Sequence, residues 1–154
     1  MRKRVGVIVA AGAILSVSLS LWAQSAPQTP ETQAPAAEGA MGLAGDVQRG
    51  QYIVEHVAMC PECHSTRDRN GNILPETRFL GGPMPPAPAW VPDWAARAPR
   101  NAGLPGYSDE QAMRLLTEGA IGRIGEQLKA PMPRFRMNRQ DAADVIAYMR
   151  TLPR

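Results

Sequence analysis

The chain has 154 residues, of which 44% are hydrophobic and 20% are charged, with 17 Lys and Arg against 14 Asp and Glu. The formal net charge of +3 equals the three bases Arg2, Lys3 and Arg4, so removing them leaves 14 bases against 14 acids. A neutral remainder excludes a nucleic-acid-binding protein, which would need a basic surface outside this segment.

The N-terminus has the composition of an export signal, because three bases precede an apolar run from Val5 to Ala23. The small residues Ala23 and Ser25 suit a cleavage site, whereas the 19 residues of the run reach the lower limit of a membrane-spanning helix. Two outcomes stay open, a cleaved signal peptide over residues 1–24 or an anchor retained through residues 5–23. Either outcome predicts a periplasmic, exported protein, and the second predicts one tethered to the inner membrane.

Residues 25–45 are rich in Pro, Ala and Gln, and such a segment buries too little apolar surface to offset its ordering entropy. We therefore expect a flexible tether there. The remaining residues, 46–154, are enough for one domain but too few for two.

The domain contains signals for three helices. Helical spacing of apolar residues predicts the first over about residues 46–59. Ser108 and Gln111 form a capping box at the start of the second, which we expect to end at Gly119. Asn138 caps the third, whose apolar stripe is halted by Pro153. The apolar stripe of this third helix consists of Ala142, Val145, Ile146 and Met149.

Between the first two helices, residues 65–107 hold eight prolines and show no alternating strand pattern. This composition predicts a long loop. Outside this loop, few residues of the domain are left for regular structure, and a hydrophobic core of that size is seldom stable without a metal, a disulfide or a cofactor. A large cofactor wrapped by the loop would account for both features.

The motif Cys60-Pro61-Glu62-Cys63-His64 indicates which cofactor this is. Two thiols three residues apart on one side of a helical turn can each add to a vinyl group of haem. The adjacent imidazole then presents a nitrogen to the iron. The spacing predicts one covalently bound haem c, attached through Cys60 and Cys63, with His64 as an iron ligand.

Two other interpretations of the motif remain. A Cys60–Cys63 disulfide of the thiol oxidoreductase type would need a βαβ context, which the proline-rich flank does not offer. Zinc held by His56, Cys60, Cys63 and His64 would place four ligands within nine residues, a poor tetrahedral arrangement.

The sequence resembles the mono-haem class I c-type cytochromes, and most closely the small exported or membrane-tethered cytochrome c domains that accompany bacterial dehydrogenases and respiratory chains. Besides the haem motif, the resemblance rests on Gly50–Val54, Gly81–Pro83, Tyr107–Gln111, Ala130–Pro133 and Asp141–Pro153. It implies an all-α, cytochrome c-like fold, with about three main helices and a long proline-rich loop wrapped around a covalently bound haem. It also implies that the first and last helices cross closely at Gly50 and Tyr148. The length and proline content of residues 83–105 depart from the family.

A second axial ligand is expected opposite His64, and sorting the eight Met residues leaves Met84, Met132 and Met137. Met84 and Met132 both lie between prolines that hold the chain extended, so local sequence does not separate them. His56 precedes Cys60 by one helical turn and is expected to be a partly exposed polar residue. The order of segments in the family implies Met132.

The resemblance also suggests the Pro75 carbonyl as the acceptor for the second ring nitrogen of His64. For Trp90 and Trp94 two roles stay open, packing over a haem edge or covering the surface of the loop.

An iron held by His64 and Met132 has no open position, which predicts a one-electron carrier and not an enzyme with its own substrate. The expected donor is a dehydrogenase or a respiratory complex, and the expected acceptor is an oxidase or another redox protein. The alternative is a haem enzyme or gas-binding protein with an open sixth position.

Residues 123–139 carry five bases against the single acid Glu126, an excess that predicts either docking of an acidic partner or a solvated face. These bases are Arg123, Lys129, Arg134, Arg136 and Arg139.

Overall fold

The computed structural model describes residues 37–38 and 42–153. The predicted signal and most of the predicted tether lie outside these residues. In the described part of the chain, no helix is long and apolar enough to cross a membrane. The fold is mainly helical, as the resemblance implied.

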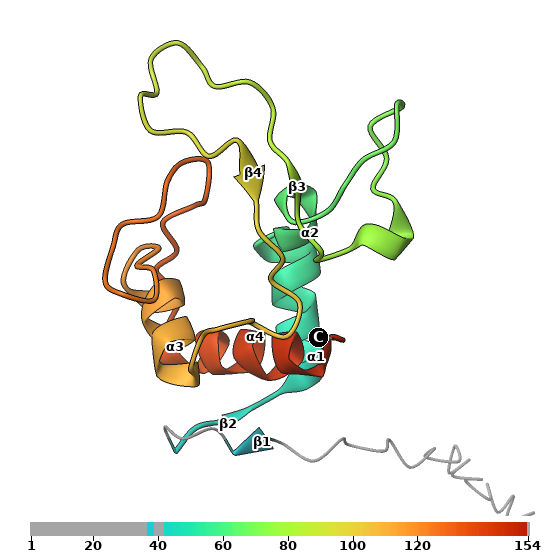
Figure 1. The fold of residues 1–154 in the computed structure, drawn as a ribbon. Helices are drawn as coiled ribbons and strands as arrows, with labels where there is room; N and C mark the ends of the chain where they lie inside the picture. Colours follow the sequence, from blue (N-terminus) through green and yellow to red (C-terminus); the bar gives the residue numbers. More distant parts are fainter. Residues whose placement is uncertain (1–36, 39–41, 154) are drawn as a thin grey trace, which may run out of the picture. The chain divides into compact units, whose positions relative to one another are not determined.

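The described helices and strands, which Figure 1 labels, have the following bounds. The helices are α1 (Val47–Tyr52), α2 (Cys60–Cys63), α3 (Asp109–Thr117) and α4 (Arg139–Thr151), with a π-helical turn η1 (Ile53–Val57) and a 3-10 turn η2 (Pro75–Thr77). The strands have two residues each: β1 (Ala37–Glu38), β2 (Ala44–Gly45), β3 (Gly82–Pro83) and β4 (Arg97–Ala98).

Helices α3 and α4 confirm the predicted caps. Ser108 and Gln111 form the reciprocal capping box at the start of α3, and Gly119 follows its end with a φ of +94°. The Asn138 side chain accepts a hydrogen bond of 2.8 Å from the Asp141 amide at the start of α4. Both helices therefore begin and end where side-chain chemistry predicts.

Helices α1 and α4 cross at Gly50, which is buried. A Cβ atom at this position would collide with the backbone carbonyl of Asp144 and lie 2.9 Å from the Cβ of Tyr148. Only glycine permits this approach, so the crossing that the resemblance placed at Gly50 and Tyr148 is confirmed. Nearby, the buried Asp144 carboxylate accepts a hydrogen bond of 2.8 Å from the Asp46 amide, which fixes the start of α1 against α4.

The segment predicted as one helix over residues 46–59 changes character in its last turn. The Ala58 amide donates to the Ile53 carbonyl at 2.7 Å, the wider spacing of a π-helix. Met59 then takes a left-handed conformation, with a φ of 49°, and ends the segment. This break allows α2 to start a new helical turn at Cys60.

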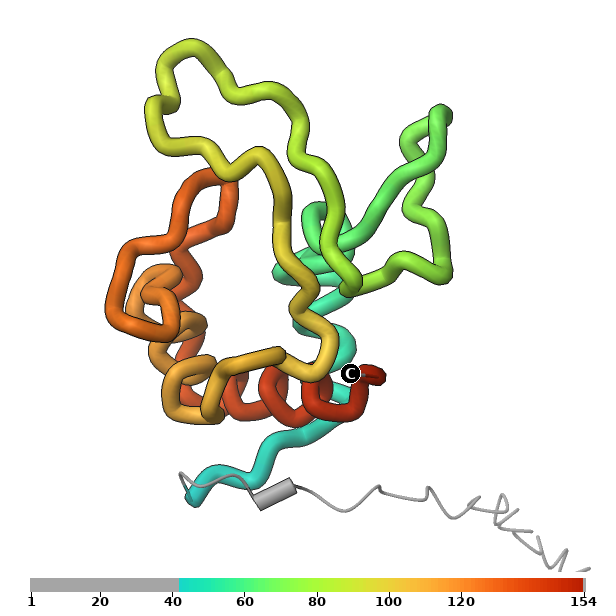
Figure 2. Tube along the Cα trace, viewed as in Figure 1, coloured from blue at the N-terminus to red at the C-terminus, as the bar shows by residue number. Residues whose placement is uncertain are grey.

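The expected long loop contains one feature that the sequence pattern did not predict. Strands β3 and β4 pair antiparallel, with Gly82 opposite Ala98 and Pro83 opposite Arg97. The ladder is too short to show a period-two pattern in the sequence. Residues 84–96, which we call the arm, connect β3 to β4 and extend away from both strands (Figure 2).

Contacts with the domain begin before residue 46. Strands β1 and β2 pair antiparallel, and the Ala44 carbonyl accepts a hydrogen bond of 2.9 Å from the Gln140 side chain. Gly45 is buried against Ala143 and Ala147 of α4. Small residues in a low-complexity segment gave no sign of this contact.

Candidate cofactor site

A cavity of about 350 Å³ lies among the helices. Its wall is formed by α2, the residues that follow β4, α3, the loop of residues 128–135 and α4. Most of the lining side chains are apolar, so the cavity suits a large apolar group.

His64 stands at this wall and is 8% exposed. Its Nδ1 atom lies 2.7 Å from the Pro99 carbonyl oxygen. If Nδ1 carries the proton, Nε2 is the nitrogen available to a metal. Burial lowers the pKa of His64, partly opposed by the hydrogen bond to Pro99, and this favours the neutral imidazole that binds metals.

The acceptor suggested by the resemblance, Pro75, is wrong. The Pro75 carbonyl accepts the Arg78 amide within the η2 turn. The close packing of Gly82 against the Ser65 carbonyl brings the β3–β4 ladder beside α2 instead. Pro99, the residue after β4, is thereby placed against the imidazole.

Cys60 and Cys63 lie at the two ends of α2, and both line the cavity. Their thiols are free and partly buried, so no disulfide joins them. Burial raises the pKa of the Cys60 thiol, a backbone hydrogen bond opposes this rise and the nearby Cys63 adds a smaller one, with a resulting value of about 11. The neutral thiol is the form present at pH 7.

The zinc set is not assembled. His56 is exposed, lies with its ring 5.6 Å from that of Tyr52, and is not part of the cavity wall. Over residues 37–38 and 42–153, no group of three or more His, Cys, Asp or Glu side chains is placed to hold a metal ion. The thiols and His64 therefore point to the cofactor interpretation of the motif.

Two of the three candidate methionines reach the cavity. Met132 lines it from the loop before α4, and Met84 lines it from the first residue after β3. Met137 instead packs against the hydrophobic core, and its amide donates to the Leu116 carbonyl at 3.0 Å. Met137 does not line the cavity.

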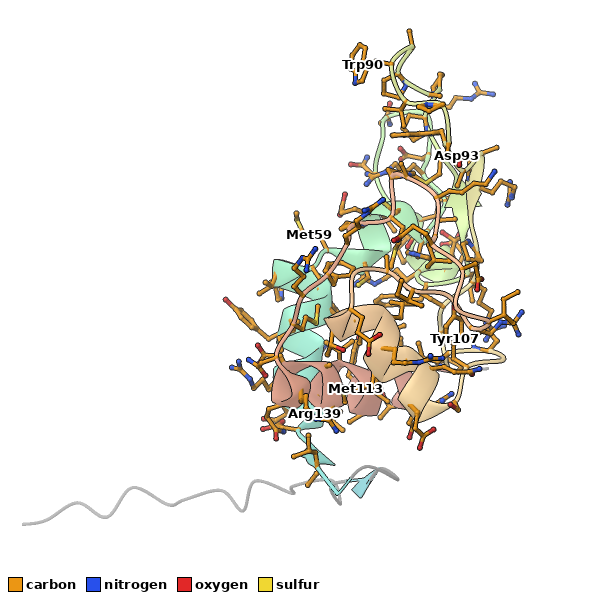
Figure 3. All side chains as sticks on the ribbon, turned by 90° about the vertical axis from the view of Figure 1, so that its left-hand side faces the viewer. Met59, Trp90, Asp93, Tyr107, Met113 and Arg139 are labelled. Carbon is orange, nitrogen blue, oxygen red and sulfur yellow. The ribbon has the colours of Figure 1, made fainter. Side chains whose placement is uncertain are left out.

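Neither tryptophan of the arm lines the cavity. Trp90 is 83% exposed and lies at the outer end of the arm (Figure 3). Trp94 is partly buried, and its Nε1 donates a hydrogen bond of 3.0 Å to the Pro85 carbonyl. Both tryptophans therefore lie on the surface of the loop, which is the second of the two roles considered, and neither borders the cavity.

The wall also has a polar part that the sequence did not reveal, because it depends on the course of the loop. Arg100, Asn101 and Lys129 line the cavity with the apolar residues. The Asn101 Oδ1 atom is buried and has no hydrogen-bond partner in the described part of the chain. A large apolar group with a charged, polar edge matches this combination, and haem is such a group. Together with two thiols, an imidazole and a thioether, the residues fit a covalently attached haem.

The comparison with known proteins agrees with this geometry. A family model described as cytochrome c matches residues 47–153, from the first residue of α1 to the proline after α4. No curated protein matches the chain.

Proposed function

Because the chain belongs to the cytochrome c family, we propose that it is a one-electron carrier that holds a single haem c between His64 and Met132. Haem-based electron transfer is the general activity of the family. The observation that supports the specific proposal is the shared wall, on which Cys60, Cys63, His64 and Met132 line one apolar cavity.

The thiols of Cys60 and Cys63 would hold the group covalently. Each sulfur forms a bond to one carbon of a vinyl group, and the thiol hydrogen is transferred to the neighbouring carbon, so no oxidant or reductant is consumed. The position of both residues on the single turn of α2 keeps the sulfurs on one side of the cavity. Attachment there also fixes the position of the following residue, His64.

When bound, haem supplies reversible one-electron exchange at its iron. The protein contributes orientation and exclusion of water. The Pro99 carbonyl orients the His64 ring, and the apolar residues of α3 and α4 form a dry wall. The Met132 thioether would complete the coordination and raise the reduction potential.

A haem enzyme or gas-binding protein with an open sixth position is the other class considered. It would require Met132 to stay away from the iron, although Met132 lines the cavity. Membership of the cytochrome c family also favours the carrier.

We further propose that the electrons pass from a dehydrogenase or respiratory complex to an oxidase or another redox protein. The basis is the apolar run and preceding bases at residues 2–23, which fit export to the periplasm with or without a retained membrane anchor. Arg134 and Arg136 closely follow Met132 in the sequence and are exposed, which suits docking of an acidic partner.

A redox titration of the protein, matured in a host that attaches haem c, tests the proposal. We expect one reversible one-electron transition, and slow uptake of cyanide by the ferric form. Rapid uptake of cyanide by the ferric form or of carbon monoxide by the ferrous form would show an open position and favour the alternative.

A further inference from the structure

We propose that the arm holds in place the loop of residues 128–135, which we call the Met132 loop, and that Trp94 is the positioning residue that keeps the arm closed. This inference rests on the proposed function, since it concerns Met132 as a ligand. It also gives a role to the proline-rich segment in which the chain departs from the family.

The first observation is a pair of backbone hydrogen bonds to Ala130, two residues before Met132. The Ala130 carbonyl accepts from the Ala95 amide at 2.7 Å, and the Ala130 amide donates to the Asp93 carbonyl at 3.2 Å. These bonds form an isolated parallel bridge between Trp94 and Ala130. The returning side of the arm thus fixes the segment that carries the proposed ligand.

The second observation is how the arm itself is held. The Trp94 indole donates to the Pro85 carbonyl across the base of the arm, at 3.0 Å, and the Met84 amide donates to the Ala96 carbonyl, also at 3.0 Å. Prolines restrict the backbone between these bonds. Trp94 therefore connects the outgoing side of the arm with the side that binds Ala130.

The same stretch of chain reaches the other ligand. Three residues after Ala96, the Pro99 carbonyl contacts the His64 imidazole at 2.7 Å. Residues 93–99 therefore contact the Met132 loop at one end and His64 at the other. A methionine thioether is a neutral, weak ligand, so its retention depends on how rarely its loop opens locally.

An ion pair offers a competing explanation for the contact between arm and loop. Lys129 Nζ lies 3.4 Å from the Asp93 carboxylate, with side chains that are 61% and 82% exposed. Exposed pairs of this kind contribute little because water and salt screen them. We therefore assign the holding role to the backbone bridge and to Trp94.

The test compares Trp94→Ala and Trp94→Phe with Trp90→Ala, which removes a tryptophan from the exposed tip of the same arm. The first readout is the rate of cyanide uptake by the ferric protein. The second is the pH at which the methionine-to-iron band disappears as the pH is raised. Losing one hydrogen bond changes an opening equilibrium roughly two- to tenfold. We expect faster uptake by that factor in both Trp94 variants, largest in Trp94→Ala, and wild-type behaviour in Trp90→Ala. The pH of band loss should fall by up to about one unit, since a tenfold change in opening is one unit of pH.

A second set of three variants tests the bridge itself. Ala95→Pro removes the amide that donates to Ala130, whereas Ala89→Pro adds a proline at the exposed tip. Asp93→Asn removes the ion pair only. We expect an effect from Ala95→Pro alone. Wild-type uptake and band in Trp94→Ala and Ala95→Pro, or an equal change in Trp90→Ala, would overturn the inference. If the wild-type protein itself shows no methionine band, the proposed function fails instead, so the two failures are distinct.

Discussion

The Nδ1 atom of His64 lies 2.7 Å from the carbonyl oxygen of Pro99, 35 residues further along the chain. This hydrogen bond joins the end of the α2 motif to the segment after β4, and it would orient the imidazole for the ligand role that we propose. The β3–β4 ladder brings the two residues together. A loop without strands would not have placed Pro99 at this position.

The first prediction concerns Cys60 and Cys63. A mature protein should carry haem that survives a denaturing gel and acid-acetone extraction, because both thioether bonds are covalent. The Cys60→Ala and Cys63→Ala variants should each keep a single bond, and the double variant should release its haem on extraction. Staining for haem peroxidase activity and an intact mass measure this. A wild-type mass without haem would contradict the assignment.

The second prediction concerns the helix crossing. Gly50→Ala adds a Cβ atom where the Asp144 carbonyl already lies, so α1 and α4 must move apart. Overpacking of this kind costs about 1–3 kcal/mol, and more where backbone must move. Urea unfolding should show a free energy of unfolding lower by this amount. The control Gln48→Ala, at an exposed position of the same helix, should change that free energy by less than about 0.5 kcal/mol. Equal stabilities of the two variants would mean that the crossing tolerates a side chain.

The third prediction concerns Glu55, which lies in η1 and contacts Tyr148 of α4. The Tyr148 hydroxyl donates to it at 2.5 Å, and Arg78 lies 2.9 Å from its other oxygen. Burial alone would raise the pKa of Glu55, but the hydrogen bond from Tyr148 and the charge of Arg78, with smaller effects of Gln51 and His56, lower it overall. The charged Glu55 therefore stabilises the fold above its ordinary pKa, and this contribution is lost as pH falls through the lower folded value.

Glu55→Gln removes that dependence. We expect the variant to be less stable than the wild type by roughly 1 kcal/mol at pH 7 and by less at acidic pH, because the wild type loses this contribution on protonation. Urea unfolding at pH 7 and near pH 3 measures both values. Glu76→Gln, at an exposed position of η2, is the matched control and should follow the wild type. A difference between Glu55→Gln and wild type that grows on acidification would contradict the sign of the pKa shift.

The fourth prediction concerns the basic residues around Met132. Arg134→Glu and Arg136→Glu should each slow electron transfer to an acidic partner at low salt and matter much less at high salt, because the Debye length shrinks. The reduction potential should change little. Arg69→Glu makes the same charge change at an exposed residue away from the cavity wall and should leave the rate near wild type. Equal rates for all variants at low salt, across candidate physiological partners, would reduce the basic segment to a solvated face.

The sequence allowed prediction of whatever depends on local chemistry. The caps at Ser108 and Asn138, the helices that follow them and the haem motif all have signals within a few residues. The acceptor for His64 was predicted wrongly, because it depends on a ladder of two residue pairs that leaves no periodic pattern. Met84 and Met132 have the same proline setting and both line the cavity, so neither local sequence nor lining separates them, and the preference for Met132 comes from the order of segments in the family.

The absorption spectrum of the ferric protein, with Met132→Ala and Met84→Ala beside the wild type, tests the proposed ligand set most directly. We expect the wild type and Met84→Ala to show the sulfur-to-iron charge-transfer band. Met132→Ala should keep its covalent haem but lose the band, and its reduction potential should fall. Loss of the band in Met84→Ala with an unchanged spectrum in Met132→Ala would move the ligand to Met84, and a wild type without the band would contradict His/Met ligation altogether.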